Sequence, residues 1–123
     1  MSDFDDQAMG RLSTHVSLAY AALAAACAAL PVPITLPIGK VSNVETGPAV
    51  ARVMDLVRDQ PMPEEQQAQL FAVCAFWLAA LDLYGLLVKE GFTNARAHSA
   101  AANLLMAEDQ LGDVLSWLRE QKE

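Results

Sequence analysis

The residue types that could do chemistry are few in this chain and lie far apart. His15 and His98 fall in different predicted helices, and neither has a second ligand at a chelating spacing. Cys27 and Cys74 form no CxxC pair. A zinc site needs about four ligands at one point, so it would require the fold to bring all four side chains together. We therefore expect no metal site.

No nucleophile is accompanied by the groups that would activate it. Ser13, Thr14 and Ser17 lie near His15, but no third side chain is placed to orient the histidine. The six glycines are isolated, so there is no glycine-rich loop that could hold a phosphate group. We expect no catalytic residue and no cofactor, and we interpret the chain as non-catalytic.

The segment EDQLGDVLSWL (108–118) resembles the last acidic helix of the MazG-type nucleotide pyrophosphohydrolases. In that family, paired acidic motifs on helices hold magnesium for nucleotide hydrolysis, and the resemblance implies that Asp113 would be a ligand. The chain departs from the family pattern at Gln110, where the family has glutamate. It departs again at Ala68, the last position of an EExxE motif that would start at Glu64. A metal-dependent nucleotide hydrolase is therefore an alternative function, not the first.

The charge balance limits the partners that the chain can bind. Fifteen acidic and eight basic residues give a net charge of −7 and a pI of about 4.6. Such a chain repels phosphate backbones and anionic lipid headgroups, so we expect no nucleic-acid partner. The N-terminal sequence SDFDD has only Arg11 before the apolar run and lacks the basic start of a signal peptide. We expect a cytoplasmic protein.

Both cysteines are surrounded by apolar sequence. A free cysteine in such surroundings usually behaves as a small buried hydrophobe. Reduced thiols are the default for a cytosolic chain, so we expect Cys27 and Cys74 to be free, although a disulfide between them stays open.

Hydrophobic periodicity predicts an all-α fold: a single-domain bundle of four main helices, with an ordered Pro-rich loop between the first and second. A chain of 123 residues fits one domain, and strand signals are nearly absent. The first helix is expected to start near Asp3 or Asp6, whose side chains can cap free amides, and to end at Leu30. Pro31 stops it because proline lacks the amide donor.

The connection to the second helix is predicted to be ordered. Prolines stiffen the loop from Pro31 to about Asn43, and the aliphatic residues between them give it something to pack with. Thr46 is the preferred N-cap of the second helix, because Pro48 then falls in the first turn, where proline is tolerated. The alternative, a capping box of Ser42 and Glu45, would place Pro48 in the helix interior.

The third and fourth helices have clear boundaries. The third is predicted to run from Pro63, in the first helical position, to Glu90, with Gly91 ending it. Thr93 or Asn94 caps the fourth. The predicted apolar stripe of the fourth helix consists of Ala97, Ala101, Leu104, Leu105, Leu111, Leu115 and Leu118.

Two stretches, 12–39 and 66–88, are long and apolar enough to cross a bilayer. The first is broken by prolines and is rich in alanine, which is only weakly hydrophobic. The flanks of both lack the clustered lysines and arginines of a cytoplasmic membrane boundary. We therefore expect a soluble bundle with no membrane partner, and keep a small membrane-active, holin-like protein as an alternative.

Asp82 is the single charge in the second of these stretches. At 100° per residue it shares its side of the helix mostly with small residues, which predicts that it lies on the least buried line, near solvent. A second interpretation makes Asp82 a buried or paired acid. Its partner would then be an arginine or histidine from another helix, since its own helix offers no base three or four residues away.

The rest of the third helix is covered by bulky side chains. Phe76, Trp77, Leu81 and Tyr84 are too many large residues for one small core, so we predict that they form an interface between two copies of the chain. The competing account is that the Pro-rich loop and the fourth helix cover this face within the monomer. The expected function is that of a small acidic helical protein that binds another protein and regulates or inhibits it; the identity of that partner stays open.

Overall fold

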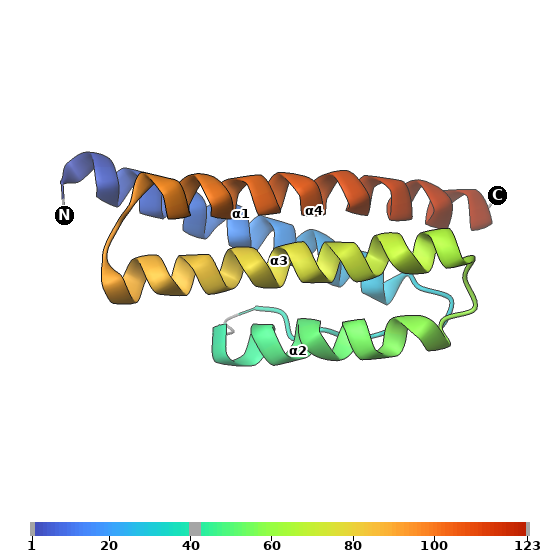
Figure 1. The fold of residues 1–123 in the computed structure, drawn as a ribbon. Coiled ribbons are helices and arrows are strands. Elements are labelled where there is room, and N and C mark those ends of the chain that lie inside the picture. The colour runs from blue at the N-terminus through green and yellow to red at the C-terminus, as the bar shows by residue number, and fades with distance from the viewer. Residues whose placement is uncertain (1, 40–42, 123) are drawn as a thin grey trace.

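The computed structural model describes residues 2–39 and 43–122 and shows an all-α bundle. Its elements are α1 (Asp3–Ala28), α2 (Asn43–Leu56), the short 3-10 helix η1 (Val57–Asp59), α3 (Glu64–Glu90) and α4 (Asn94–Gln121). α3 occupies the centre, with α4 along one side, α2 along the other and α1 behind (Figure 1). The described ranges contain no strand. The predicted bundle of four main helices is confirmed.

α3 and α4 form an antiparallel hairpin joined by residues 91–93. Gly91 ends α3 with φ at 102° and ψ at 160°, a conformation that side-chain-bearing residues rarely adopt. Thr93 caps α4, because its hydroxyl oxygen accepts a hydrogen bond of 3.3 Å from the backbone N–H of Arg96. Arg96 also pairs with Glu90 across the turn at 2.9 Å. The predicted end at Gly91 and cap at Thr93 are therefore both confirmed.

The buried stripe of α4 is rotated from the predicted one. Its members are spaced alternately four and three residues apart, which keeps a straight seam facing α3. They are Ala100, Leu104, Ala107, Leu111, Val114 and Leu118. Leu105, which was predicted to be part of the stripe, is 60% exposed because it lies one residue, about 100° of helix rotation, away from Leu104.

The predicted start of α2 is wrong. The helix begins at Asn43, so Thr46 lies inside it and Pro48 lies further in; Ser42 is outside the described residues. Pro48 cannot donate to the carbonyl of Val44, but Val44 is exposed, so water can replace the missing donor. Within this first part of the helix the side chain of Thr46 is buried, whereas Val44 and Glu45 are exposed.

Both ends of α1 and the N-terminal end of α3 differ slightly from the predictions. Ser2, not Asp3 or Asp6, caps α1: its hydroxyl accepts a hydrogen bond of 3.1 Å from the backbone N–H of Asp5. The aspartates lie in the first turn, where their negative charges interact favourably with the positive end of the helix dipole. α1 ends at Ala28, before the predicted Leu30, and Pro63 is the N-cap of α3, not its first residue.

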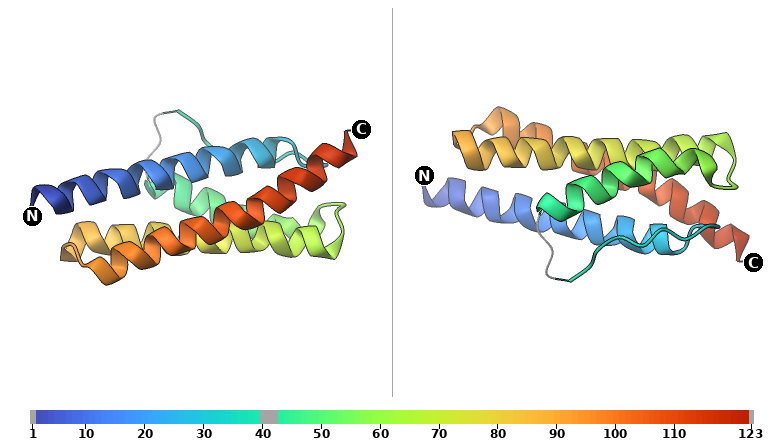
Figure 2. Two further views of the ribbon diagram at one scale, coloured as in Figure 1. Left: turned by 90° about the horizontal axis from the view of Figure 1, so that it is seen from above. Right: turned by 90° about the horizontal axis from the view of Figure 1, so that it is seen from below.

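The Pro-rich segment, residues 31–39 in the described part, is ordered and runs back along α1 (Figure 2). Ile34 and Leu36 are buried in the core. The side chain of Gln60, after η1, accepts a hydrogen bond of 3.0 Å from the N–H of Val32 and donates one of 2.6 Å to its carbonyl oxygen. The prediction of a loop packed across the bundle is confirmed for these residues.

Cys27 and Cys74 are free and buried in the core. Burial raises the pKa of each thiol to about 12, because a thiolate would lose its hydration there. They are inert small hydrophobes, as expected from their apolar surroundings.

Candidate functional site

The side chains singled out for metal chemistry sit in different environments. The Nε2 atom of His15, on α1, lies 2.5 Å from the Oε1 atom of Glu108, on α4, so this pair ties the two helices together. His98 is exposed on α4, whereas the two cysteines are inside the core. Across residues 2–39 and 43–122, no group of three histidine, cysteine or acidic side chains is placed to hold a metal ion.

The acidic residues of the MazG-like segment are spread over the surface of α4. Asp113, the position implied by the resemblance as a magnesium ligand, is exposed, and Gln110 beside it is half-buried. Glu64, at the start of the corresponding upstream motif, lies in the exposed first turn of α3.

Asp82 lies in the C-terminal half of α3 and is exposed. The two ion pairs found within the described part of the chain are His15 with Glu108 and Arg96 with Glu90, and neither involves Asp82. This agrees with the interpretation that Asp82 lies on the least buried line of the helix, near solvent, and not with a buried acid.

The four residues predicted to form an interface divide into two groups. Trp77 is 2% exposed and Leu81 is 8% exposed, so both belong to the core of the single chain. Phe76 and Tyr84 are half-buried and pack against that core. For Trp77 and Leu81 the competing account applies, because the chain's own helices cover them. Trp77 and Leu81 are therefore not available to a partner, and the interface stays a prediction for the half-buried Phe76 and Tyr84.

A further candidate surface is the side of α3 that carries Asp82. We call it the open face of α3; its residues are exposed or half-buried, and they are Ala68, Phe71, Ala72, Ala75, Leu78, Ala79, Asp82, Gly85, Leu86 and Lys89. α3 is long and apolar enough to cross a membrane by length and composition, yet only 28% of its most apolar stretch is buried. The bundle thus leaves partly exposed an apolar surface that soluble proteins usually bury.

The open face has the shape of a helix-packing surface. Ala68, Ala72, Ala75 and Ala79 follow one another at steps of four, three and four residues, which keeps them on one line along α3. Larger side chains flank that line, among them Phe71, which is 45% exposed. A line of small residues between larger ones allows a second helix to approach closely and to interdigitate with the flanks.

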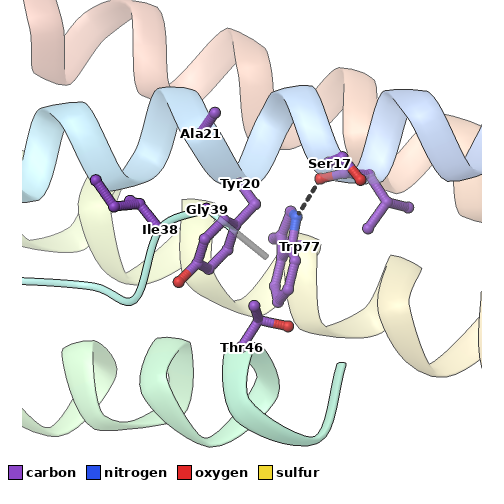
Figure 3. Close-up of a pocket in the computed structure, with 8 residues that line it drawn as sticks. Ser17, Tyr20, Ala21, Ile38, Gly39, Thr46 and Trp77 are labelled. Carbon is purple, nitrogen blue, oxygen red and sulfur yellow. Dashed lines mark hydrogen bonds between the residues drawn. The ribbon is translucent and has the colours of Figure 1, made fainter. Parts of the chain in front are cut away.

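A second feature is a cleft of about 190 Å³ between α1, the end of the Pro-rich segment and the first turns of α2. Tyr20 and Trp77 stand side by side in it, with ring centroids 5.4 Å apart, and Thr46 approaches them from α2 (Figure 3). Val16, Ser17, Ala21, Ile38 and Gly39 complete the lining. None of the lining residues carries a charge.

The polar atoms of the cleft differ in how they are satisfied. The indole N–H of Trp77 donates to the carbonyl oxygen of Val16 at 3.0 Å, and the hydroxyl of Tyr20 donates to that of Pro37 at 2.6 Å. Thr46 is 6% exposed, and its hydroxyl oxygen has no hydrogen-bond partner within the described residues. A buried hydroxyl without a partner costs about 1–3 kcal/mol.

The sequence pattern does not predict this cleft: it favours Thr46 as a helix cap and gives Tyr20 no role. The available signal was that Tyr20 is the one aromatic residue in the alanine-rich run of residues 12–30, where a large side chain needs a partner. The partner, Trp77, lies far along the chain, so local pattern could not identify it.

Comparisons of this chain with protein-family models, with curated proteins and with solved structures find no match. The open face of α3 and the Tyr20–Trp77 cleft are therefore the starting points for its function.

Proposed function

We propose that this chain is a non-catalytic binding protein that acts through the open face of α3, where it receives an apolar helix, either from a second copy of the chain or from a protein that it regulates or inhibits. The observation that carries the proposal is the partial exposure of this face: the central helix of the bundle is apolar enough for a bilayer, but only 28% of its most apolar stretch is fully buried, and Phe71 and Leu86 on the open face are exposed. Burial of apolar surface contributes about 25 cal/mol per Å², so a docked helix would be stabilised strongly.

Asp82 defines the chemistry of the helix that fits. It lies in the middle of the open face, so a docked helix would remove its carboxylate from water. Such a burial is costly unless a cation pairs with the carboxylate. The partner helix therefore carries small and aliphatic residues, with one lysine or arginine placed opposite Asp82.

A second copy of the chain meets this requirement and is the first occupant to test. Lys89 is the one basic residue of α3 and lies on the same face as Asp82, two turns further along. If two α3 helices cross in antiparallel orientation near Gly85, only residues 81–90 of the two helices overlap: Asp82 of each copy faces Lys89 of the other, and the alanine line from Ala68 to Ala79 lies outside this contact. A two-fold dimer would then form the same ion pair twice. Gly85 at the crossing would allow close backbone approach.

Sedimentation at tens of micromolar protein tests this dimer. The expected mass is about twice the chain mass of 13.2 kDa. Leu86→Glu, next to the crossing, should give a monomer. Leu105→Glu is the matched control, since it places the same charge on an exposed leucine of α4, away from the open face, and should stay dimeric.

A charge exchange tests the pairing itself. Asp82→Lys should dissociate the dimer because it sets like charges opposite each other, and Asp82→Lys with Lys89→Asp in the same chain should restore it. A chain of monomer mass at this concentration would overturn the dimer and leave a helix of another protein as the occupant.

A bilayer is the other apolar environment that could cover α3, and its length and composition favour this second candidate. Asp82 opposes it, because a carboxylate at the centre of a bilayer costs about 2.5–3.5 kcal/mol on insertion scales. Flotation with neutral phosphatidylcholine vesicles separates the two: co-flotation of the wild type that Leu86→Glu abolishes would favour the membrane over a partner helix.

A further inference from the structure

A groove lies between α1 and α4 at the end of the bundle where both helices begin (Figure 1). Its volume is about 270 Å³, and we call it the α1–α4 groove. It is lined by one side of α1 over residues 4–15, by the first two turns of α4 and by Phe92 in the turn before α4. None of these lining residues belongs to the open face of α3, so a site here is independent of the proposed function.

The apolar part of the groove is open to a ligand. Phe4, on α1, is 65% exposed, and Phe92 is half-buried, so both rings can be reached from solvent. Alanines from both helices and the buried side chain of Leu12 line it between them. A cavity of about 150 Å³ holds a benzene molecule, so this groove has room for one ring with a polar substituent.

The polar part of the groove is basic. Arg11 from α1 and His98 from α4 both line it, and both are exposed. The positions three and four residues away from each of them on its own helix hold no aspartate or glutamate. The two ion pairs formed within residues 2–39 and 43–122 involve neither side chain. Their N–H groups are therefore available to an acceptor on a ligand.

The remaining charges near the groove do not cancel this basic character. His15 also lines it, but its Nε2 atom lies 2.5 Å from Oε1 of Glu108, so it is already engaged. Glu108 is outside the lining, which contains no other acidic side chain from the described part of the chain. The positive end of the α4 dipole lies at the same place and favours a negative charge there. In a chain with a net charge of −7, this groove is a local site for an anion.

The two parts together specify the ligand. The guanidinium group of Arg11 is a planar set of N–H donors that matches the two oxygens of a carboxylate. A small inorganic anion would leave the phenylalanine rings uncovered, and a neutral ring would leave Arg11 without a partner. We propose that the α1–α4 groove binds a small aromatic carboxylate, whose ring contacts Phe4 and Phe92 and whose carboxylate accepts hydrogen bonds from Arg11 and His98.

Titration of the full chain with benzoate, at fixed pH and ionic strength, tests this proposal by NMR. The chain has two histidines, both of which line the groove, whereas neither tryptophan does. Benzoate should shift the ring C–H resonances of the histidines with saturation and leave the indole N–H resonances in place. Benzamide keeps the ring without the charge, and acetate keeps the charge without the ring. Each should bind at least about threefold more weakly than benzoate.

Arg11→Gln tests the carboxylate contact, because it removes the charge from an exposed side chain. Its affinity for benzoate should fall by about threefold or more, and the preference for benzoate over benzamide should disappear. Arg119→Gln is the matched control: it makes the same change in net charge at the exposed C-terminal end of α4 and should keep the wild-type affinity. The proposal is overturned if benzoate gives no saturable shift, if benzamide binds as tightly, or if the two variants lose affinity equally.

Phe4→Ala tests the ring contact separately. It should weaken the binding of benzoate and leave that of acetate unchanged, because only benzoate has a ring to place against Phe4. Leu18→Ala is its control, since Leu18 is also on α1 and also 65% exposed but lies outside the groove. Wild-type affinity for benzoate in Phe4→Ala, or an equal loss in Leu18→Ala, would rule out the proposed site.

Discussion

The indole N–H of Trp77, in the middle of α3, donates a hydrogen bond of 3.0 Å to the backbone carbonyl oxygen of Val16, in the middle of α1. An α-helical carbonyl normally accepts from the amide four residues later, so this oxygen uses a second lone pair for the indole. The bond fixes the rotation and height of α1 relative to α3. It also orients the Trp77 ring as one wall of the cleft.

Trp77→Phe should therefore destabilise the fold and not merely alter its surface. The substitution removes the hydrogen bond and leaves space in a position that is 2% exposed. We expect a loss of about 2–4 kcal/mol in the free energy of unfolding, measured by urea titration followed by circular dichroism. Trp117→Phe, at the half-buried tryptophan of α4, is the control and should cost less than half as much. Equal losses would mean that Trp77 has no special structural role.

The position of Trp77 also shows what a sequence pattern can and cannot predict. The limits of α3 followed from Pro63 and Gly91, because proline and glycine act through the local backbone. The exposed line through Asp82 followed from helical periodicity alone. Trp77 faces the chain's own core because it contacts Val16 and Tyr20, which come from another helix. A pattern within α3 carries no information on these contacts, so it did not predict that Trp77 is enclosed within one chain.

The predictions for Thr46 and Leu105 were wrong for the same kind of reason. The rules for helix ends favoured Thr46 as a cap, because Pro48 disfavours an earlier start. In the structure the side chain of Thr46 is buried beside Tyr20 and Trp77, inside a helix that begins three residues earlier. For α4, leucines were given more weight than alanines, but the seam with α3 uses Ala100 and Ala107 and leaves Leu105 in solvent. Tertiary packing decided both cases.

Removal of the Thr46 hydroxyl should stabilise the folded protein. Thr46→Val keeps the side-chain shape and removes a buried hydroxyl without a partner, so we expect the free energy of unfolding to rise by about 1–2 kcal/mol. Thermal and urea unfolding of the two proteins measure this. Thr14→Val is a useful contrast, because the Thr14 hydroxyl is exposed and donates a hydrogen bond of 3.0 Å to the carbonyl oxygen of Gly10. This substitution should change the free energy of unfolding little. A loss of stability in Thr46→Val would show that the hydroxyl is satisfied in solution.

Gly91 and Gly112 offer a matched pair of glycine substitutions with opposite expected signs. An added methyl group would meet no atom within 4 Å at either position, so crowding is excluded for both. Gly91 has φ at 102°, a conformation that strains any other residue, and Gly91→Ala should cost about 1–3 kcal/mol. Gly112 lies inside α4, where alanine is the better helix former, and Gly112→Ala should add about 1 kcal/mol. Urea unfolding of both variants tests the pair, and a loss in each would mean that the hairpin turn is not the source of the Gly91 effect.

The two buried thiols should make the fold sensitive to alkali. The pKa of each is about 12 in the folded chain, against an ordinary value of 9.0, because burial disfavours the thiolate. Between these values the folded state binds more protons than the unfolded state, so stability is fully present below about pH 9 and falls as the pH rises toward 12. Each thiol contributes up to about 1.4 kcal/mol per pH unit, and the raised pKa of buried Tyr20 acts in the same direction.

Urea unfolding at pH 8, 9 and 10 measures this alkaline loss. The free energy of unfolding should be nearly level at the first two values and should decline at the third. The double variant Cys27→Ala with Cys74→Ala is the control: it starts less stable, because two small core side chains are shortened, but its decline should be shallower. The unfolded wild-type chain exposes both thiols at their ordinary pKa, so the difference between the two slopes isolates their contribution. Parallel declines in the two proteins would place the alkaline sensitivity in Tyr20 or in the surface charges instead of the thiols.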